Sequence, residues 1–261
     1  MISFTNTELY ALVAGFLWPL TRILGLIAAA PLFGNLSVPV RVKLGLGIML
    51  TLVIAPTVPA QPAADPMSLA GLLILMQQLV IGLAMGFAMR LVMAAVEMAG
   101  EAAGLTMGFG FATFFDPQTR ARTSALAQFL ALLALMIFLA LDVHLMMLET
   151  LARSFVSLPI AATPMGAGGF RQLALWGGLI FSAGVQLALP VIAALLLTNI
   201  ALGILTRAAP QLNLFGIGFP VTLGAGFIVL MLSLPYLRGP IERMFEQGNG
   251  FIRQTLVVPA R

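Results

Sequence analysis

The sequence lacks the side chains on which most enzymes and disulfide-linked proteins depend. It has no cysteine, which excludes disulfide bonds, thiolate nucleophiles and cysteine-based metal sites. Its single histidine, His144, excludes a metal site made of two histidines at helical spacing. We find neither a phosphate-binding glycine loop nor a nucleophile elbow. The residues therefore predict a protein that is not an enzyme and that needs no cofactor or metal.

Charged residues are also scarce. They make up 8% of the 261 residues, whereas a soluble domain carries roughly 25%. Hydrophobic residues make up 61%, and the mean hydropathy is +1.07. A chain with so little charge cannot cover itself with a polar surface, so we expect a membrane protein. The thirteen basic and nine acidic residues are spread among apolar runs, which favours membrane topology over nucleic-acid binding.

The apolar residues form about six blocks. These blocks are residues 9–33, 42–58, 68–110, 123–158, 172–205 and 214–237. As one helix, the block 68–110 would reach roughly 65 Å at ~1.5 Å per residue, about twice the ~30 Å hydrocarbon core. It contains Arg90, Glu97 and Glu101, each of which would cost about 2.5–3.5 kcal/mol at a bilayer centre. We expect this block either to break into a hairpin or to leave the hydrocarbon and pack against protein.

Two other blocks also contain features that conflict with a plain span. The block 123–158 carries Asp142 and His144, and Pro190 in the block 172–205 favours a kink or a break. After the last block, residues 238–261 form a tail of mixed charge. We therefore expect an all-α integral membrane protein of long kinked helices and helical hairpins.

Five ionisable residues inside these blocks are candidate functional residues, and we expect all five to be buried against protein. Arg90, Glu97 and Glu101 lie near one stripe of a helix, because they are spaced by seven and four residues. They fit an ion or proton site, but also an intersubunit salt bridge or the wall of a wet pore. Asp142 and His144 fit a proton relay, or a polar pair satisfied inside an interface.

Two sets of glycines in the block 68–110 are spaced four residues apart. Gly82 and Gly86 form one pair, and Gly100, Gly104 and Gly108 form a triplet. Small residues at this spacing let another helix approach closely where lipid gives no hydrophobic drive for association. We interpret this face as a face for helix packing rather than a ligand site.

The stretch 107–122 is the most unusual part of the chain. Aromatic residues and a methionine alternate with glycines before a turn and two cations: Met107, Gly108, Phe109, Gly110, Phe111, Phe114, Phe115, Asp116, Pro117, Arg120 and Arg122. The glycines loosen the backbone, and Asp-Pro favours a turn. A buried core turn fits this pattern, and so does a hydrophobic constriction that keeps a pore dewetted.

Several separated motifs resemble one family over nearly the whole length. They are Arg22; Pro31, Phe33 and Gly34; Pro39 and Arg41; Met107 to Gly110 with Asp116 and Pro117; and Arg207, Pro210, Gln211, Asn213, Phe215, Gly218, Phe219 and Pro220. On these residues the chain resembles the FliR family of flagellar export-gate proteins, which has an injectisome counterpart. The family usually has Gly-His-His after the residue that matches Asp142. This chain has Val143, His144 and Leu145 instead, which weakens any role for a histidine pair.

The resemblance implies a non-catalytic subunit that joins FliP and FliQ in a helical ring, the start of a type III channel for unfolded flagellar proteins. It implies FlhA and FlhB as further partners, and no nucleotide or nucleic acid. It also implies the bacterial inner membrane at the flagellar basal body, with much of the chain on the periplasmic side of the bilayer. Residues 1–170 would be FliP-like, and residues 171–261 would form a FliQ-like hairpin and tail. The loop 104–122 would plug the pore, with Met107 and the four phenylalanines as its seal.

Two alternatives belong to other classes of protein. A self-contained secondary transporter would place Glu97, Glu101 and Asp142 beside broken helices, but we see no convincing inverted repeat. An intramembrane enzyme would need a nucleophile–base or metal constellation that the residues do not offer.

For the ring subunit we expect the glycine face to pack against FliP or FliQ, so that Gly104→Leu blocks their assembly.

Overall fold

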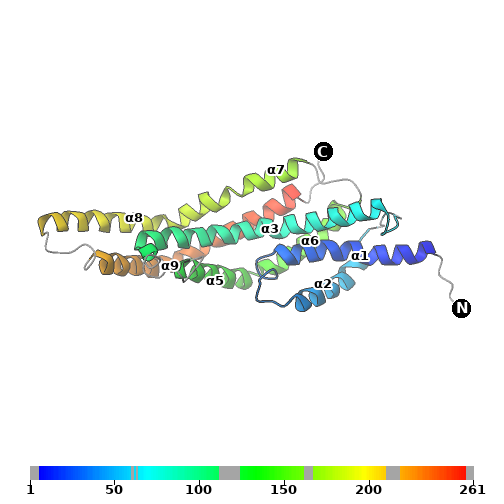
Figure 1. The fold of residues 1–261 in the computed structure, drawn as a ribbon, viewed down its shortest axis with the longest axis horizontal. Helices are drawn as coiled ribbons and strands as arrows, with labels where there is room; N and C mark the ends of the chain where they lie inside the picture. Colours follow the sequence, from blue (N-terminus) through cyan, green and yellow to red (C-terminus); the bar gives the residue numbers. More distant parts are fainter. Residues whose placement is uncertain are drawn as a thin grey trace. The chain divides into compact units, whose positions relative to one another are not determined.

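Every regular element in the described part of the chain is helical. The computed structural model describes residues 6–59, 62, 64–111, 124–161, 167–209 and 218–256. The helices are α1 (Asn6–Ala29), α2 (Val40–Ile54), α3 (Leu69–Met107), α5 (Ala125–Ala140), α6 (Val143–Ser157), α7 (Ala167–Trp176), α8 (Leu179–Ala208) and α9 (Phe219–Phe251) (Figure 1). Five helical stretches are long and apolar enough to cross a membrane, or up to six if the bent pair α5–α6 counts as one. The predicted all-α membrane fold is confirmed.

Local sequence signals explain several helix ends. Helix α1 ends at Ala29, just before Pro31, because proline disfavours helical geometry in the residue that precedes it. Helix α2 starts directly after Pro39, whose fixed φ suits a helix start. The hydroxyl of Ser124 accepts a hydrogen bond from the Ala127 amide at 3.1 Å and so caps α5.

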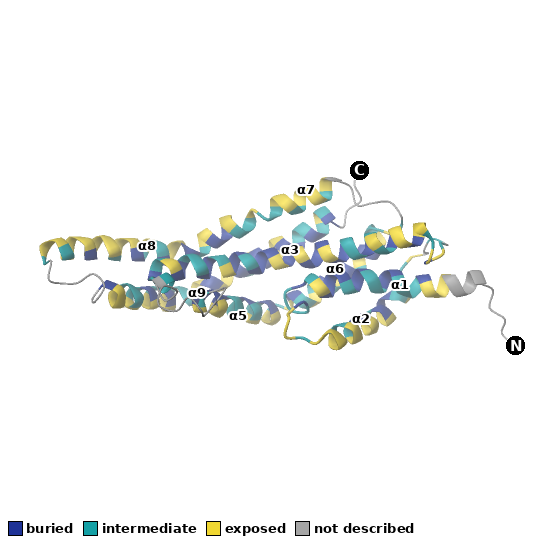
Figure 2. Cartoon of the chain, viewed as in Figure 1, coloured by how far each residue is buried: buried dark blue, intermediate teal, exposed yellow. Residues whose placement is uncertain are grey.

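Helix α3 decides whether the block 68–110 breaks into a hairpin. It is one continuous helix of 39 residues, so the hairpin is wrong. Such a helix is about 58 Å long at ~1.5 Å per residue, longer than the hydrocarbon core. In its most apolar window 67% of the residues are buried by this chain, against 17% in α2, and Figure 2 shows the contrast.

Three other boundaries differ from the expected ones. The block 123–158 breaks into α5 and α6, which are bent by 64°, with Asp142 at the break in a left-handed conformation (φ 54°). Helix α8 runs through Pro190 without a break, so of the expected kink or break the break is wrong. The mixed-charge tail is helical as far as Leu256, because α9 continues through Pro235 and Pro240 to Phe251 and a π-helical turn follows.

The chain divides into two compact units that are not contiguous in sequence. Unit 1 comprises residues 1–91, 142–177 and 245–261, and unit 2 comprises residues 92–141 and 178–244. Helices α3 and α9 therefore contribute to both units. The two units are defined by contacts within the chain. The FliP-like and FliQ-like parts are defined by likeness to other proteins, so the division into those two parts stays a prediction.

Unit 1 is tied together by a buried arginine. The side chain of Arg22 in α1 is fully buried. Its Nε donates to Gln78 Oε1 of α3 at 2.8 Å, and its Nη atoms donate to the carbonyls of Ser154 and Leu158 at the end of α6, both at 2.9 Å. The guanidinium also lies over the ring of Phe155, 4.3 Å from its centroid. One side chain thus joins three helices.

The C-terminal segment is held in unit 1 by polar and aromatic contacts. Phe251 stacks on Trp176 at the end of α7, with ring centroids 4.6 Å apart. The buried Asn249 accepts a hydrogen bond from Thr150 in α6 at 3.0 Å. Arg253 and Arg153 both contact Glu149, and the pair between Arg153 and Glu149, four residues apart in α6, is 2.7 Å long.

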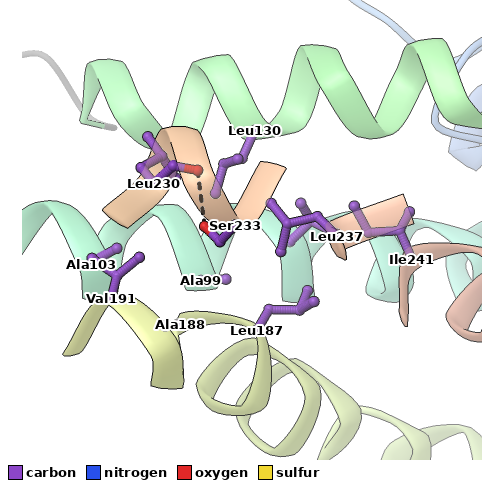
Figure 3. Close-up of a pocket in the computed structure, with 11 residues that line it drawn as sticks. Ala99, Ala103, Leu130, Leu187, Ala188, Val191, Leu230, Ser233, Leu237 and Ile241 are labelled. Carbon is purple, nitrogen blue, oxygen red and sulfur yellow. Dashed lines mark hydrogen bonds between the residues drawn. The ribbon is translucent and has the colours of Figure 1, made fainter. Parts of the chain in front are cut away.

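Unit 2 packs parts of α3, α5, α8 and α9 around a small apolar cavity (Figure 3). Its volume is about 10 Å³, and Ser233 is the one lining residue with a polar side chain. The Ser233 hydroxyl donates to the Leu230 carbonyl of its own helix at 2.9 Å, so it offers no donor to a ligand. A space this small is at the limit for a single water, and we regard it as part of the core.

Candidate functional site

The candidate site comprises the described residues on either side of the unusual stretch 107–122, where the chain leaves α3 and where it enters α5. Met107 is the last residue of α3 and is fully buried. Gly108 follows with a left-handed φ of 93°, and its amide donates to the Leu105 carbonyl at 3.1 Å. A glycine in this conformation ends a helix without the strain that a Cβ would add. The chain therefore turns sharply at Gly108, into a short 3-10 turn over Phe109–Phe111.

The residues on either side of the turn at Gly108 pack against helix α9. The Phe109 ring meets the Phe227 ring edge to face, with centroids 6.1 Å apart at 89°. Met107 lies against bare backbone at Gly226, where an added Cβ would be 2.6 Å from Met107 Cγ. The start of the loop is thus packed on α9.

The other end of the loop is held by the same stretch of α3. The Ser124 amide donates to Glu101 Oε1 at 2.6 Å, which is a charge-assisted bond. A Cβ at Gly104 would lie 3.2 Å from Ser124 Oγ, so α3 and the start of α5 are close there as well. Glu101, half-buried, therefore has a role that the sequence did not suggest: it fixes the point at which the chain returns.

Several predicted loop residues lie outside the described residues: Phe114, Phe115, Asp116, Pro117, Arg120 and Arg122. Of the predicted seal, the structure brings together Met107, Gly108, Phe109 and Gly110, and it describes only the backbone of Phe111. What it shows is a fixed base on which an aromatic segment is mounted. Among the described residues no group of histidine and carboxylate side chains could hold a metal ion.

The glycine face of α3 has a different role from the expected one. A Cβ at Gly82 would meet the Arg22 carbonyl of α1, and one at Gly86 would lie 2.8 Å from the Ala30 amide. A Cβ at Gly100 would meet the backbone of Ala127 in α5. Helices of the same chain thus occupy the positions that we assigned to other subunits. The four-residue spacing correctly indicated close helix packing, but not which helices pack.

Gly82→Ala is expected to destabilise the protein by about 1–3 kcal/mol, because backbone must move to admit the methyl group. The matched control is Gly45→Ala in α2, where nothing lies within 4 Å of the added Cβ. That change should be neutral or stabilising by up to ~1 kcal/mol, since alanine favours helix. Thermal unfolding of the purified variants measures the difference. Equal melting temperatures would show that α1 and α3 do not pack this closely.

The expected buried charges are not fully buried within this chain. Arg90, Glu97 and Asp142 are exposed, and Glu101 and His144 are half-buried. Their burial by another subunit stays a prediction. Among the described residues the one charged side chain that the chain itself buries is Arg22. The sequence placed Arg22 only in a family motif. Two signals of a buried polar contact were nevertheless visible: a cation within one apolar run and Gln78 within another.

The remaining motif residues lie in the two helix connections. Pro31, Phe33, Gly34, Pro39 and Arg41 form the turn between α1 and α2 and the first turn of α2, with Gly34 buried and Arg41 exposed. Lys43 donates to the Gly34 carbonyl at 3.1 Å and closes this turn.

The second motif surrounds the connection from α8 to α9. Arg207 is exposed in the last turn of α8, where a cation suits the negative end of the helix dipole. Gly218 is buried and Phe219 and Pro220 begin α9. The other members lie outside the described residues: Pro210, Gln211, Asn213 and Phe215.

The described residues define an all-α membrane protein in which Phe109 packs on α9 and the start of α5 is bound to α3. The sequence model of the family described as "Bacterial export proteins, family 1" matches residues 13–248. The chain belongs to this family. It is 45% identical to the flagellar biosynthetic protein FliR of Pectobacterium carotovorum subsp. carotovorum over 247 residues, which cover 95% of this chain and 94% of the relative.

Other relatives carry the same name. The flagellar biosynthetic protein FliR of Escherichia coli (strain K12) is 42% identical over 247 residues, with 95% of this chain and 94% of the relative covered. That of Bacillus subtilis (strain 168) is 30% identical over 250 residues, with 95% and 96% covered. Together with the apolar helices, these matches give the chain a role in flagellar export as a membrane-associated flagellar protein. The resemblance found in the sequence is thereby confirmed.

Proposed function

We propose that this chain is a non-catalytic subunit of the flagellar type III export gate. It assembles with FliP and FliQ into the channel through which unfolded flagellar proteins leave the cell. The gate lies in the inner membrane at the basal body, with much of this chain on the periplasmic side of the bilayer. FlhA and FlhB act on it as neighbouring export components.

The fixed base of the aromatic loop is the observation that carries the proposal. A plug must return to the same position in the pore after each protein has passed, so both of its ends need firm attachment. Here one end packs on α9 through Phe109, and the other is bound by Glu101. Bulky apolar side chains on such a base would exclude water from a narrow pore, and an unbroken water column is what ions need to leak through it.

The surfaces of the long helices support assembly with other subunits. Helix α3 exceeds the hydrocarbon thickness, and only 17% of the most apolar window over α7 and α8 is buried by this chain. Large apolar side chains are exposed along α8, among them Phe181, Leu197 and Ile204. Extended apolar surface of this kind needs cover from lipid or protein. A ring of subunits covers those parts of it that extend beyond the bilayer.

Co-expression with FliP and FliQ tests the assembly. We expect this chain to co-purify with both proteins in one complex, and to aggregate or be degraded when it is expressed alone. A secondary transporter would instead purify alone as a stable, uniform particle and would transport a solute in vesicles. A stable lone chain that does not bind FliP or FliQ would contradict the proposal. Imaging the complex would then locate residues 104–122 relative to the pore.

A further inference from the structure

We propose that Gly226 and Phe227 of α9 form a seat that positions the described part of the seal, Met107 and Phe109. This inference rests on the proposed function, because it concerns the same apolar seal. It adds α9, more than a hundred residues further along the chain, to the elements that set the position of the seal.

The first part of the seat is a notch at Gly226. Gly226 is buried, and a Cβ there would lie 2.6 Å from Met107 Cγ, 2.8 Å from Cε and 3.0 Å from Sδ. The methionine side chain thus lies along the bare Cα of this glycine. Two residues earlier, Gly224 has no atom within 4 Å of the corresponding position. The notch is therefore specific to one glycine of the helix.

A methyl group in this notch would displace the methionine and leave α9 in place. The atoms that it would meet belong to a flexible side chain, and methionine changes shape easily. Met107 immediately precedes Gly108, where the backbone turns with a positive φ. Moving Met107 would therefore shift the point from which the aromatic segment starts.

The second part of the seat is the ring of Phe227. It meets Phe109 edge to face, the arrangement that aromatic quadrupoles favour. Phe227 is 52% exposed, so its ring is not needed to fill the core. The contact fixes the direction of the first aromatic side chain after the turn. Because both contacts come from consecutive residues of α9, any movement of this part of α9 moves Met107 and Phe109 with it.

Leakage of ions through the assembled gate tests the seat with matched variants. In a complex co-expressed with FliP and FliQ, we expect Gly226→Ala and Phe227→Ala to raise ion leakage several-fold at unchanged yield of the complex. Gly224→Ala and Ile228→Ala, on the same helix, should leave leakage at the level of the parent protein. Leakage that does not distinguish these two pairs of variants would overturn the inference.

Phe109→Ala separates failure of the seat from failure of the proposed function. If Phe109→Ala leaks and the two seat variants do not, the seat is wrong and the seal stands. If Phe109→Ala assembles and does not leak either, the described residues do not form a seal and the proposed function fails at this point.

Crosslinking decides the case in which a seat variant does not assemble. The chain contains no cysteine, so Phe109→Cys with Phe227→Cys supplies the only two thiols of this subunit. A short reducible thiol crosslinker should join them and lower the export of flagellar proteins, and reduction should restore that export. Phe109→Cys with Ile228→Cys, which points about 100° away around the helix, should crosslink poorly. Equal crosslinking of both pairs, or export that crosslinking does not change, would overturn the seat.

Discussion

Arg22→Ala is expected to cause the largest loss of stability of any single substitution in the chain. The change removes a fully buried guanidinium that donates to Gln78 Oε1 and to the carbonyls of Ser154 and Leu158. Hydrogen bonds from a charged donor contribute about 1.5–3 kcal/mol each, and a buried acceptor left without a partner costs about 1–3 kcal/mol. The cavity and the lost contact with Phe155 add to this.

The expected destabilisation is at least about 3 kcal/mol, which lowers the melting temperature by roughly 6–12 °C in a chain of this size. Arg22→Lys should recover little of it, because a single ammonium cannot replace the planar fork that reaches two helices. Thermal unfolding in detergent, together with the amount of protein in the membrane, measures both variants.

Arg153→Ala is the matched control. Arg153 is also an arginine in a helix of unit 1, but its side chain is 70% exposed and its partner Glu149 is itself 47% exposed. Exposed ion pairs contribute about 0–1 kcal/mol, so this variant should unfold close to the parent temperature. If Arg22→Ala unfolded like Arg153→Ala, the joining of α1, α3 and α6 through Arg22 would be wrong.

Composition and hydrophobic runs were enough to predict the class of fold. A chain with 8% charge has no means of building a soluble surface, and its apolar blocks are longer than the roughly 4–8 residues of a typical strand. The same signals could not determine the breaks. Proline favours a break only where its lost hydrogen bond is not compensated, and α8 and α9 continue through Pro190, Pro235 and Pro240. The real break is at Asp142, which has no proline beside it.

The candidate site could be located from the sequence but not assembled from it. Glycines among aromatics marked residues 107–111 as unusual, and the resemblance gave them a role. The partners of that segment, Gly226 and Phe227, are far away in sequence, and no local pattern connects them to it. Spacing alone does not identify the partner helix. The glycines of α3 indicated that another helix lies close, and the structure shows that this helix is α1 for Gly82 and α5 for Gly100.

Glu101 shows why a charge in an apolar run is hard to interpret from spacing. Its spacing from Glu97 suggested a shared ion site on one helical stripe. In the structure Glu97 is exposed, while Glu101 accepts a hydrogen bond from the Ser124 amide at 2.6 Å. A carboxylate at the N-terminal end of α5 also suits the positive end of the helix dipole. The residue thus holds the returning end of the loop to α3.

Replacing the four loop phenylalanines by alanine is expected to raise ion leakage through the assembled gate by the largest factor of any variant. The four residues are Phe109, Phe111, Phe114 and Phe115. Aromatic side chains in a narrow pore exclude water because the apolar walls offer it no hydrogen bonds, and ions cannot cross a dry segment. Alanine widens the opening and lets a continuous water column form.

Ion leakage is measured in cells or vesicles that contain the complex with FliP and FliQ, at matched amounts of complex. Phe109→Ala with Phe111→Ala should leak less than the four-residue variant, because half of the rings remain. Phe87→Ala with Phe170→Ala is the control for loss of aromatic surface, since both of these rings are exposed on helices outside the loop. That control should leave leakage unchanged.

The order of leakage among these variants distinguishes a lost seal from a general defect in assembly, because such a defect would lower the yield of complex in all of them. A seal predicts full assembly, leakage that grows with the number of loop rings removed, and no leakage from the control outside the loop. If the four-residue variant assembled and conducted like the parent protein, these phenylalanines would not be the seal. The interpretation of this stretch as a buried turn would then be the better one, and its substitution should lower the melting temperature instead.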